Sequence, residues 1–381
     1  MVEPFKNLIN GDLIQATGAH LKRVWPAFDQ KRFVRVAGHG LAALEMKARA
    51  MQIASALEAT LPQDFDRAAG ILESGLAPAH TEANLGGMRI GPAGLAGWVI
   101  WSLGEFVVRR GQDQPERALE ALREFTQRFS AEFSIRPFIA AHPKLALDTL
   151  HVWTRDPNVH VRRLVSEGSR PRLPWGLQLK ALVADPSPTL PLLRALQDDP
   201  SEYVRRSVAN HLNDIAKDHP AVVADWLADH LPHATKERMV MLRHASRTLV
   251  KRGDARVLEA WGVGSAFKGS AALKVDPPRV RIGDTLALSL TLRSTAPREQ
   301  KLVLDYALHH VKADGSTSPK VFKGWSTHLA KGQVLTLNKR HSMREVTTRR
   351  YHAGLHRIDV VANGAVVASA EFTLLLPALP R

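Results

Sequence analysis

The residues best suited to chemistry in this sequence are acids that stand among arginines near the middle of the chain. Residues 155–175, RDPNVHVRRLVSEGSRPRLPW, hold five arginines, and the only acids among them are Asp156 and Glu167. A carboxylate in that setting is either a structural counter-ion or a working group beside a polyanion. The counter-ion is the simpler interpretation, because an exposed helical pair such as Arg163 with Glu167 is common and contributes only about 0–1 kcal/mol.

This stretch belongs to an internal repeat. LALDTLHVWTRDPNVHVRR (145–163) aligns with PTLPLLRALQDDPSEYVRR (188–206) at an offset of 43 residues. Each copy predicts one helix, an Asp-Pro turn and a second helix, which is the HEAT-like pattern. Such units cannot bury their apolar faces alone, so we expect them to stack into a solenoid with a concave surface.

The repeat predicts that polar side chains of successive units share one surface. In the second helix of the later copy, Arg206, Asn210 and Asp214 recur every four residues on one polar side. Glu167 aligns with Asn210, so stacked repeats would bring Glu167, Asn210 and Asp214 together. The alternative for Asp214 is an ion pair within its own helix, with Lys217.

An ordered exit is predicted after the helix over residues 159–168. Gly168 is expected to end that helix, and Pro171 and Pro174 restrict the backbone that follows. This exit would present Trp175, although a tryptophan is more often a packing residue than a binding one.

The elements that must position these residues fall into two parts. Up to residue 262, apolar side chains recur at helical spacing between short breaks. Beyond it, residues 280–294 and 356–376 alternate apolar and polar side chains, and Asp-Gly and Asn-Gly pairs mark hairpin turns. We predict a multi-domain chain, α then β: a HEAT-like α-helical repeat solenoid over 1–262, a linker over 263–273 and an immunoglobulin-like β-sandwich over 274–381.

The charge of the chain favours a polyanionic partner, with nucleic acid first. The net charge is +15 over 381 residues, and the last 114 residues carry 18 Lys and Arg against 8 Asp and Glu. Within this part, the densest basic run is Lys339, Arg340, Arg344, Arg349 and Arg350. We expect the sandwich to grip duplex DNA through these residues, and the alternative is a domain that only caps the last repeat.

Several classes of chemistry lack their signature residues. The chain has no cysteine, which excludes disulfides and thiolate chemistry. His309 and His310 are adjacent in a predicted strand, so they point to opposite faces and do not suggest a metal site. A dioxygenase would need a His-x-Asp…His iron site, and none is convincing. We expect no metal, no cofactor, no membrane segment, a monomer and a cytoplasmic location.

Longer strings resemble one repair family. AEFSIRPFI, DPNVHVRRLVSEGSRPRLPW and DDPSEYVRRSVANHLNDIAKDHP are similar to the AlkC branch of the AlkC/AlkD DNA alkylation-repair glycosylases, and the resemblance covers nearly all of residues 3–262. It implies a solenoid that cradles alkylated duplex DNA and a monofunctional enzyme that removes cationic bases such as 3-methyladenine and, in this branch, 3-methylcytosine. It also implies the immunoglobulin-like domain, which members of this branch carry.

The resemblance carries specific roles onto this chain. By position in the motifs, the catalytic residues are Glu132, Glu167, Asp214 and Trp175. Glu132 also has a simpler interpretation, as an acid in the first turn of a helix. The predicted DNA-binding residues of the solenoid are the polar residues around these acids: Arg162, Arg163, Arg170, Arg172, Arg205, Arg206 and Asn210.

The mechanism expected for such a site is electrostatic. An alkylated ring nitrogen makes the base a cation whose glycosidic bond is already weak, and the sugar becomes oxocarbenium-like as the base departs. A fixed carboxylate stabilises that charge and can align water, while arginines hold the DNA backbone. The competing hypothesis is a non-enzymatic HEAT-repeat scaffold that binds nucleic acid or an acidic protein.

Overall fold

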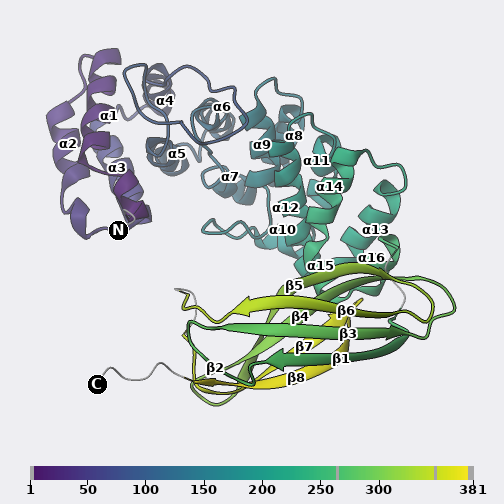
Figure 1. The fold of residues 1–381 in the computed structure, drawn as a ribbon. Coiled ribbons are helices and arrows are strands. Elements are labelled where there is room, and N and C mark those ends of the chain that lie inside the picture. The colour runs from purple at the N-terminus through teal and green to yellow at the C-terminus, as the bar shows by residue number, and fades with distance from the viewer. Residues whose placement is uncertain (1–3, 263–265, 347–349, 376–381) are drawn as a thin grey trace, which may run out of the picture. The chain divides into compact units, whose positions relative to one another are not determined.

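The computed structural model describes residues 4–262, 266–346 and 350–375. The chain divides into two compact units, residues 1–223 with 233–245 and residues 224–232 with 246–381. Figure 1 shows helices in the first unit and two β-sheets in the second. Helices α15 (Arg247–Arg252) and α16 (Ala255–Ala260) belong to the second unit, so this division falls before the predicted boundary at residue 262.

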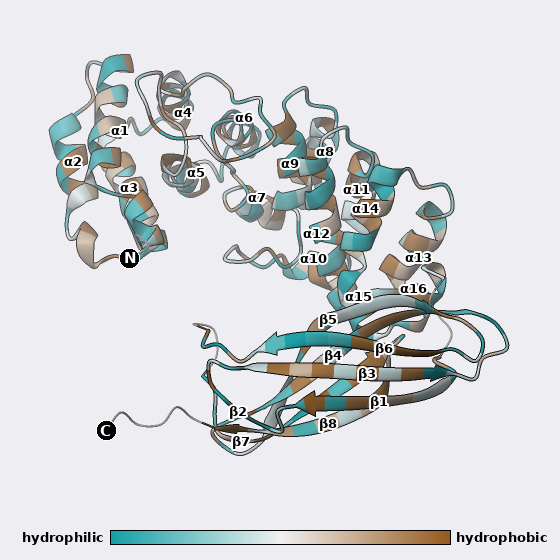
Figure 2. Ribbon diagram, in the orientation of Figure 1, coloured by the Kyte–Doolittle hydropathy of each residue, from teal (hydrophilic) through white to brown (hydrophobic). Residues whose placement is uncertain are grey.

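The first unit is a stack of helices that pack in chain order, as the repeat predicted. Buried apolar residues recur along these helices, and Figure 2 shows hydrophobic and hydrophilic residues interleaved along their ribbons. The elements are η1 (Phe5–Leu8), α1 (Gly11–Val24), α2 (Gln30–Gly38), η2 (Leu41–Ala43), α3 (Met46–Thr60), α4 (Phe65–Ser74), α5 (Val99–Arg110), α6 (Pro115–Thr126), α7 (Arg136–Ala141), α8 (Pro143–Trp153), α9 (Val159–Gly168), α10 (Lys180–Ala184), η3 (Ser187–Thr189), α11 (Leu190–Leu196), α12 (Glu202–Asp218) and α14 (Lys236–Ala245). Helix α13 (Pro220–His230) lies across the division between the units.

Recurring arginine–aspartate contacts connect successive helical pairs. Arg123 of α6 donates to Asp156 in the turn after α8, at 2.7 Å. Arg162 of α9 donates two hydrogen bonds to Asp199, the corresponding residue of the next repeat, at 2.7 and 3.2 Å. Since both aspartates belong to the Asp-Pro turns of the aligned repeat, each turn fixes the helical pair beside it.

The second unit contains a β-sandwich. One sheet has the order β1-β3-β6 and the other β2-β8-β7-β4-β5, and a buried apolar core lies between them. The strands are β1 (Gly269–Asp276), β2 (Arg279–Arg281), β3 (Thr285–Ser294), β4 (Gln300–Val311), β5 (Thr317–Leu329), β6 (Val334–Ser342), β7 (Gly354–Ala362) and β8 (Ala365–Leu375). Strand β1 begins at Gly269, so the linker predicted over 263–273 extends too far into the sandwich.

Candidate functional site

Helix α9 delivers Glu167 to the interior of the first unit. Asn158 caps its first turn by accepting the amide hydrogen of His160, and Val161, Leu164 and Val165 are buried against neighbouring helices. Glu167 lies in the last turn, and its side chain is only 7% exposed. Such a carboxylate must be paired and hydrogen-bonded, because isolated burial of its charge would be very costly.

Arg170 joins two of the predicted acids. Its Nη1 donates to Oε1 of Glu167 at 2.5 Å, and its Nε donates to Oδ2 of Asp214 at 2.8 Å. The other Glu167 oxygen accepts the Ser207 hydroxyl at 2.6 Å, and Lys217 donates to Asp214 at 2.8 Å. The predicted alternative for Asp214, a pair with Lys217, is therefore present, together with a second and more deeply buried partner.

Arg163 lies between the other two acids. Its Nη1 donates to Oε2 of Glu132 at 2.9 Å, whereas its Nη2 lies 3.7 Å from Oε2 of Glu167. The Ser130 hydroxyl also donates to Glu132, at 2.7 Å, and the Arg163 guanidinium lies 5.1 Å from the ring centroid of Tyr203. The helical pair predicted between Arg163 and Glu167 exists, but Glu132 is the nearer partner.

The arginines of the cluster favour the ionised form of Glu167. Burial alone raises the pKa of Glu167, but Arg163 and Arg170 outweigh it, so the pKa lies below its ordinary value of 4.5. The same attraction outweighs burial at both arginines and raises the pKa of each. Three carboxylates face Arg163, Arg170 and Lys217, so the charges within the cluster balance.

Two of the acids reach an open pocket of about 440 Å³. Glu132 and Glu167 line it together with Arg170, whereas Asp214 lies behind them with a side chain only 2% exposed. Glu132, at 17%, is the most exposed of the three acids. The structure therefore brings together the three acids that the resemblance assigned to the site, but only the two glutamates line the open pocket.

Aromatic side chains line much of the rest of the pocket, and none of them except Trp175 was predicted from the sequence. Trp98 packs on Phe129 with ring centroids 4.7 Å apart, and Trp101 packs on Phe133 at 5.1 Å. The signal was available in the string WVIW at the start of α5, and in the two phenylalanines that flank the motif around Glu132. Tryptophan and phenylalanine offer flat faces for stacking on a base or a sugar.

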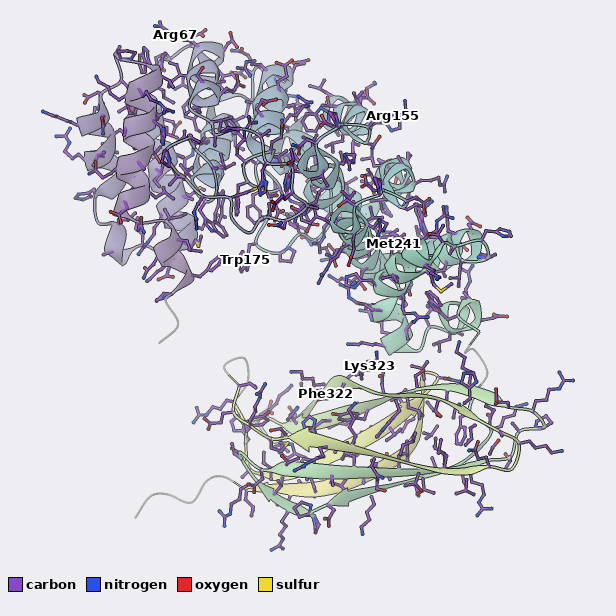
Figure 3. The ribbon with its side chains drawn as sticks, turned by 45° about the horizontal axis from the view of Figure 1, so that its top comes forward. Arg67, Arg155, Trp175, Met241, Phe322 and Lys323 are labelled. Carbon is purple, nitrogen blue, oxygen red and sulfur yellow. The ribbon has the colours of Figure 1, made fainter. Side chains whose placement is uncertain are left out.

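Trp175 joins these aromatic side chains from the segment after α9. It is 76% exposed, and Figure 3 shows it at the edge of the first unit. Its φ of 64° lies in the left-handed region, which is strained for a residue with a large side chain. An exposed aromatic ring held in a strained backbone is more consistent with binding than with packing.

Most of the predicted DNA-binding arginines of the solenoid are occupied by protein partners. Arg162 pairs with Asp199, and Arg205 donates to the main-chain oxygens of Asp199 and Pro200 at 2.6 and 2.9 Å. Arg172 pairs with Asp218 at 2.6 and 2.8 Å. Arg163 and Arg170 hold the acids, so all five of these arginines have protein partners, and their predicted contacts with DNA stay a prediction.

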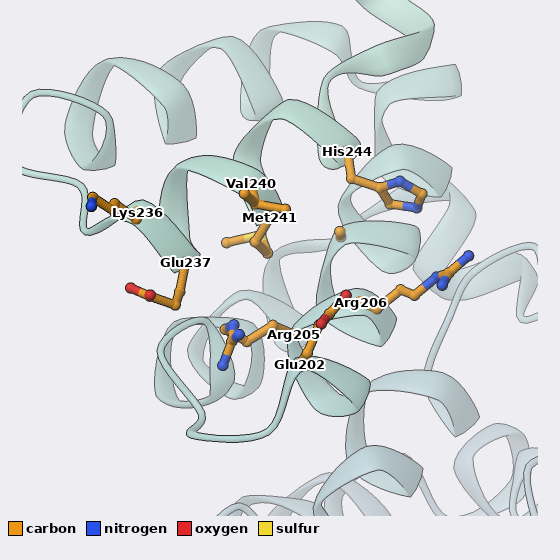
Figure 4. Close-up of a pocket in the computed structure, with 9 residues that line it drawn as sticks. Glu202, Arg205, Arg206, Lys236, Glu237, Val240, Met241 and His244 are labelled. Atoms are coloured by element: carbon orange, nitrogen blue, oxygen red, sulfur yellow. The ribbon is translucent and has the colours of Figure 1, made fainter. Parts of the chain in front are cut away.

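Arg206 and Asn210 lie away from the acids, on the side of α12 that faces α14. Figure 4 shows Arg206 and His244 beside a separate pocket of about 530 Å³ between these helices. Asn210 Oδ1 is 2.9 Å from His244 Nε2. Asn210 does not line the pocket that the two glutamates share, and its predicted grouping with Glu167 and Asp214 stays a prediction. Arg206 is exposed and remains a candidate for a phosphate contact.

The basic residues of the sandwich divide between two faces. In β6, Lys339 points inward, donates to the Gly324 oxygen at 3.1 Å and lies 5.9 Å from the centroid of Trp325. Its neighbour Arg340 is exposed and, by strand alternation, points to the opposite face. Arg344 and Arg350, beyond the strand, are also exposed. Arg349 lies outside the described residues. Lys339 is thus the least suited of the predicted contacts, because strand alternation turns it away from its neighbours.

The described residues contain neither a membrane-spanning helix nor a cluster of metal-binding side chains. Over 4–262, 266–346 and 350–375, no helix is both long and apolar enough to cross a lipid bilayer. Within the same ranges, the side chains form no group of three or more His, Asp or Glu residues arranged to hold a metal ion.

Comparisons with known proteins agree across both parts of the chain. The model of a family described as "DNA alkylation repair enzyme" matches residues 117–249, and that of "Uncharacterised protein YhaZ, C-terminal Ig-like domain" matches residues 269–376. The uncharacterized protein YhaZ of Bacillus subtilis (strain 168) is 36% identical over 373 residues, which cover 96% of this chain and 98% of that protein. The solved structure of Pseudomonas fluorescens alkylpurine DNA glycosylase AlkC bound to DNA containing an abasic site analog is 37% identical. The match covers 98% of this chain and 100% of the AlkC chain, with a TM-score of 0.88.

Proposed function

This chain belongs to the AlkC-type DNA alkylation repair glycosylases, and we propose that it hydrolyses the N-glycosidic bond of cationic alkylated bases in double-stranded DNA. The first substrate to test is 3-methyladenine and the second is 3-methylcytosine. The observation that carries the proposal is the pair of glutamates, Glu132 and Glu167, at one open pocket beside the exposed Trp175.

The chemistry follows from charge. The departing alkylated base already carries a positive charge and needs no proton, whereas the sugar gains positive charge as the bond lengthens. A preformed carboxylate stabilises that charge without reorganisation, and at 4 Å and an effective dielectric near 20 the attraction is about 4 kcal/mol, as an upper limit. Such a carboxylate can also accept a proton from the water that attacks the anomeric carbon.

The two glutamates have different freedom to act. Glu132 accepts hydrogen bonds from Ser130 and Arg163 and is the more exposed, which suits it to meet the sugar or the attacking water. Glu167 is fixed by Arg170 and Ser207 and contributes a deeper negative charge. Asp214 acts through Arg170, because it does not line the pocket.

The arginines around the acids serve the carboxylates in this proposal. Arg163 and Arg170 hold the two glutamates in place by hydrogen bonds, so the contacts to the DNA backbone fall to other residues. Exposed cations such as Arg206, Arg340, Arg344 and Arg350 are the candidates. The aromatic ring of Trp175 can stack on deoxyribose or on the lesion, which as a cation attracts an aromatic face. Because the proposed substrate is DNA, the proposed place of action of the protein is the cytoplasm of a bacterium.

Release of free base tests the function directly. The protein is incubated with a duplex that carries one 3-methyladenine, and free base and abasic sites are measured together. We expect both to appear in equal amounts, without strand cleavage, because the chain offers carboxylates and no lysine at the pocket. Bound DNA whose lesions stay intact after prolonged incubation would instead support the scaffold hypothesis.

A further inference from the structure

A buried arginine that does not line the pocket contacts the segment that carries two of the pocket residues, Arg170 and Trp175. Arg136, in the first turn of α7, is fully buried. Its guanidinium donates to the main-chain oxygens of Gly168 at 2.8 Å, Arg170 at 2.7 Å, Pro171 at 3.5 Å and Leu177 at 2.5 Å. These four acceptors span the segment from the end of α9 to the residue two positions after Trp175.

The partners of this arginine are unusual for a buried cation. Every hydrogen bond that it donates within the described residues goes to a main-chain oxygen, and none goes to a carboxylate. A planar guanidinium presents five N–H groups in a fixed fork, so it can satisfy several carbonyl oxygens that converge from one loop. This geometry determines where the backbone of residues 168–177 runs.

Two glycines let the segment approach closely. A Cβ at Gly168 would lie 2.5 Å from Cγ2 of Ile135, and a Cβ at Gly176 would lie 3.2 Å from Nε of Arg136. Both ends of the segment therefore rest on residues 135 and 136. Glu167 and Arg170 lie at its start, and Trp175 adopts its left-handed backbone between the two contacts.

We propose that Arg136 is a positioning residue for the reaction: it clasps residues 168–177 and thereby holds Glu167, Arg170 and Trp175 in their working geometry. It does not line the pocket, and its full burial keeps it from contact with DNA. The proposal rests on the glycosylase function proposed above, but the clasp itself is a property of the protein alone. The burial of Arg136 lowers its pKa to about 10, which leaves it charged at neutral pH.

The chain offers a matched control for the test. Arg49 is also buried, and it too donates to main-chain oxygens, those of Leu44 at 2.9 Å, Lys6 at 3.0 Å and Ile9 at 2.8 Å. None of these residues lines the pocket. Arg→Lys at either position keeps the charge and removes the fork, so the two variants differ mainly in which segment is released.

The first measurement is hydrogen exchange of the intact protein without DNA. The amides of Gly176 and Leu179 donate within the segment, to Leu173 and Pro171, each at 3.2 Å. In Arg136→Lys we expect these two amides to exchange at least about tenfold faster, while those of α3 and α12 stay as in the parent. In Arg49→Lys the segment should exchange at the parent's rate.

The second measurement separates positioning from stability. At a temperature well below either unfolding transition, Arg136→Lys should lower kcat for 3-methyladenine release at least about tenfold and change the affinity for undamaged duplex less than about twofold. Arg49→Lys should lower the unfolding temperature and leave kcat unchanged. Gly176→Ala, which presses on the Arg136 side chain, should shift exchange and kcat in the same direction as Arg136→Lys.

The outcomes are distinguishable. Faster segment exchange with no base release by the parent protein would sustain the clasp and overturn the proposed function. Parent-like segment exchange in Arg136→Lys, or exchange that rises equally throughout the helical unit, would overturn the clasp. Faster segment exchange with an unchanged kcat would overturn the role of Arg136 as a positioning residue.

Discussion

Glu167 and Asp214, on different helices, are hydrogen-bonded to the same guanidinium, that of Arg170. Each carboxylate thereby sets the position of the other. The loss of either leaves Arg170 with one acidic partner in a buried site, and a buried charge with an incomplete partner is costly. Changes in catalysis at this cluster must therefore be measured together with changes in stability.

The first prediction concerns Glu167→Gln. It should abolish most excision, because the charge that faces the sugar is lost, and leave DNA affinity equal or higher, because a charge that repels phosphate is also lost. Arg163 and Arg170 would lose a counter-charge, so the free energy of unfolding should fall by about 3 kcal/mol. Single-turnover rates, duplex binding and urea unfolding check these three effects.

The control for this change is Glu202→Gln, which removes an exposed acid from the first turn of α12 and should leave excision intact. A Glu167→Gln protein that loses DNA binding in step with excision would return Glu167 to the role of a structural ion pair.

The second prediction compares Glu132, which lines the pocket, with Asp214, which is buried behind it. Glu132→Gln should reduce excision strongly with a stability loss of about 1 kcal/mol or less, because the side chain is partly exposed. Asp214→Asn should destabilise the protein more, because that carboxylate is buried between Arg170 and Lys217. Paired measurements of kcat and unfolding free energy decide the assignment, and equal stability losses would contradict it.

The third prediction concerns the strained backbone of Trp175. Asparagine tolerates a positive φ better than tryptophan, so Trp175→Asn should leave the free energy of unfolding unchanged or raise it by up to about 1 kcal/mol. Excision should fall about tenfold or more, since the stacking face is lost. Trp175→Phe keeps a ring and should retain more activity than the asparagine variant. Destabilisation by Trp175→Asn would show that the indole packs on the protein.

The fourth prediction is a dependence of stability on pH. Burial lowers the pKa of His160 and of His211 to about 4. The unfolded chain takes up these protons near pH 6.5 and the folded protein only near 4, so stability falls as the pH drops through this window. By pH 5 the loss should be about 1–2 kcal/mol for each histidine.

His160→Phe tests this relation, because the ring contacts with His80 and Tyr203, both at 5.5 Å between centroids, can persist without a titrating group. Urea unfolding at pH 7.5 and pH 5 should then show a smaller difference than in the parent protein. An unchanged difference would assign the acid sensitivity to other groups.

The fifth prediction uses two neighbours on β6. Arg340→Ala should weaken duplex binding and reduce the slope of log affinity against log salt by about one, as expected for the loss of one phosphate contact. Lys339→Ala should leave that slope unchanged and lower the unfolding temperature of the sandwich, because Lys339 bonds Gly324 and covers Trp325. Equal salt slopes for both variants and the parent would mean that this face does not contact DNA.

The sequence predicted the local structure well because periodicity and turn chemistry are local. The helix predicted over 159–168 is α9, Gly168 ends it, and the aligned repeat corresponds to α8–α9 and α11–α12. The resemblance to known strings also brought the three acids into one candidate site. The alternation along β6 was equally visible, and applied to Lys339 and Arg340 it would have divided the basic run correctly.

Contacts between distant segments were beyond prediction from the sequence. The sequence does not distinguish an arginine that faces phosphate from one that faces a buried acid. One acidic partner of Arg170, Asp214, lies 44 residues further along the chain, on α12. The role of Arg136 could not be predicted either. Its partners are main-chain oxygens, which every residue type carries, so no pattern of side chains indicates them. A single helix also does not indicate which neighbour covers its polar side, as Asn210 shows.

The contacts of Arg123 with Asp156 and of Arg162 with Asp199 set the dimensions of the site as well as the spacing of the helices. Glu167 lies on α9, Asp214 on α12 and Glu132 in the turn before α7, so the distances among the three acids depend on how successive helices are joined. A change in these arginine–aspartate contacts would alter the distances among the three acids, and so their placement around the sugar, without any substitution in the pocket. Evolution could adjust the activity by the same route.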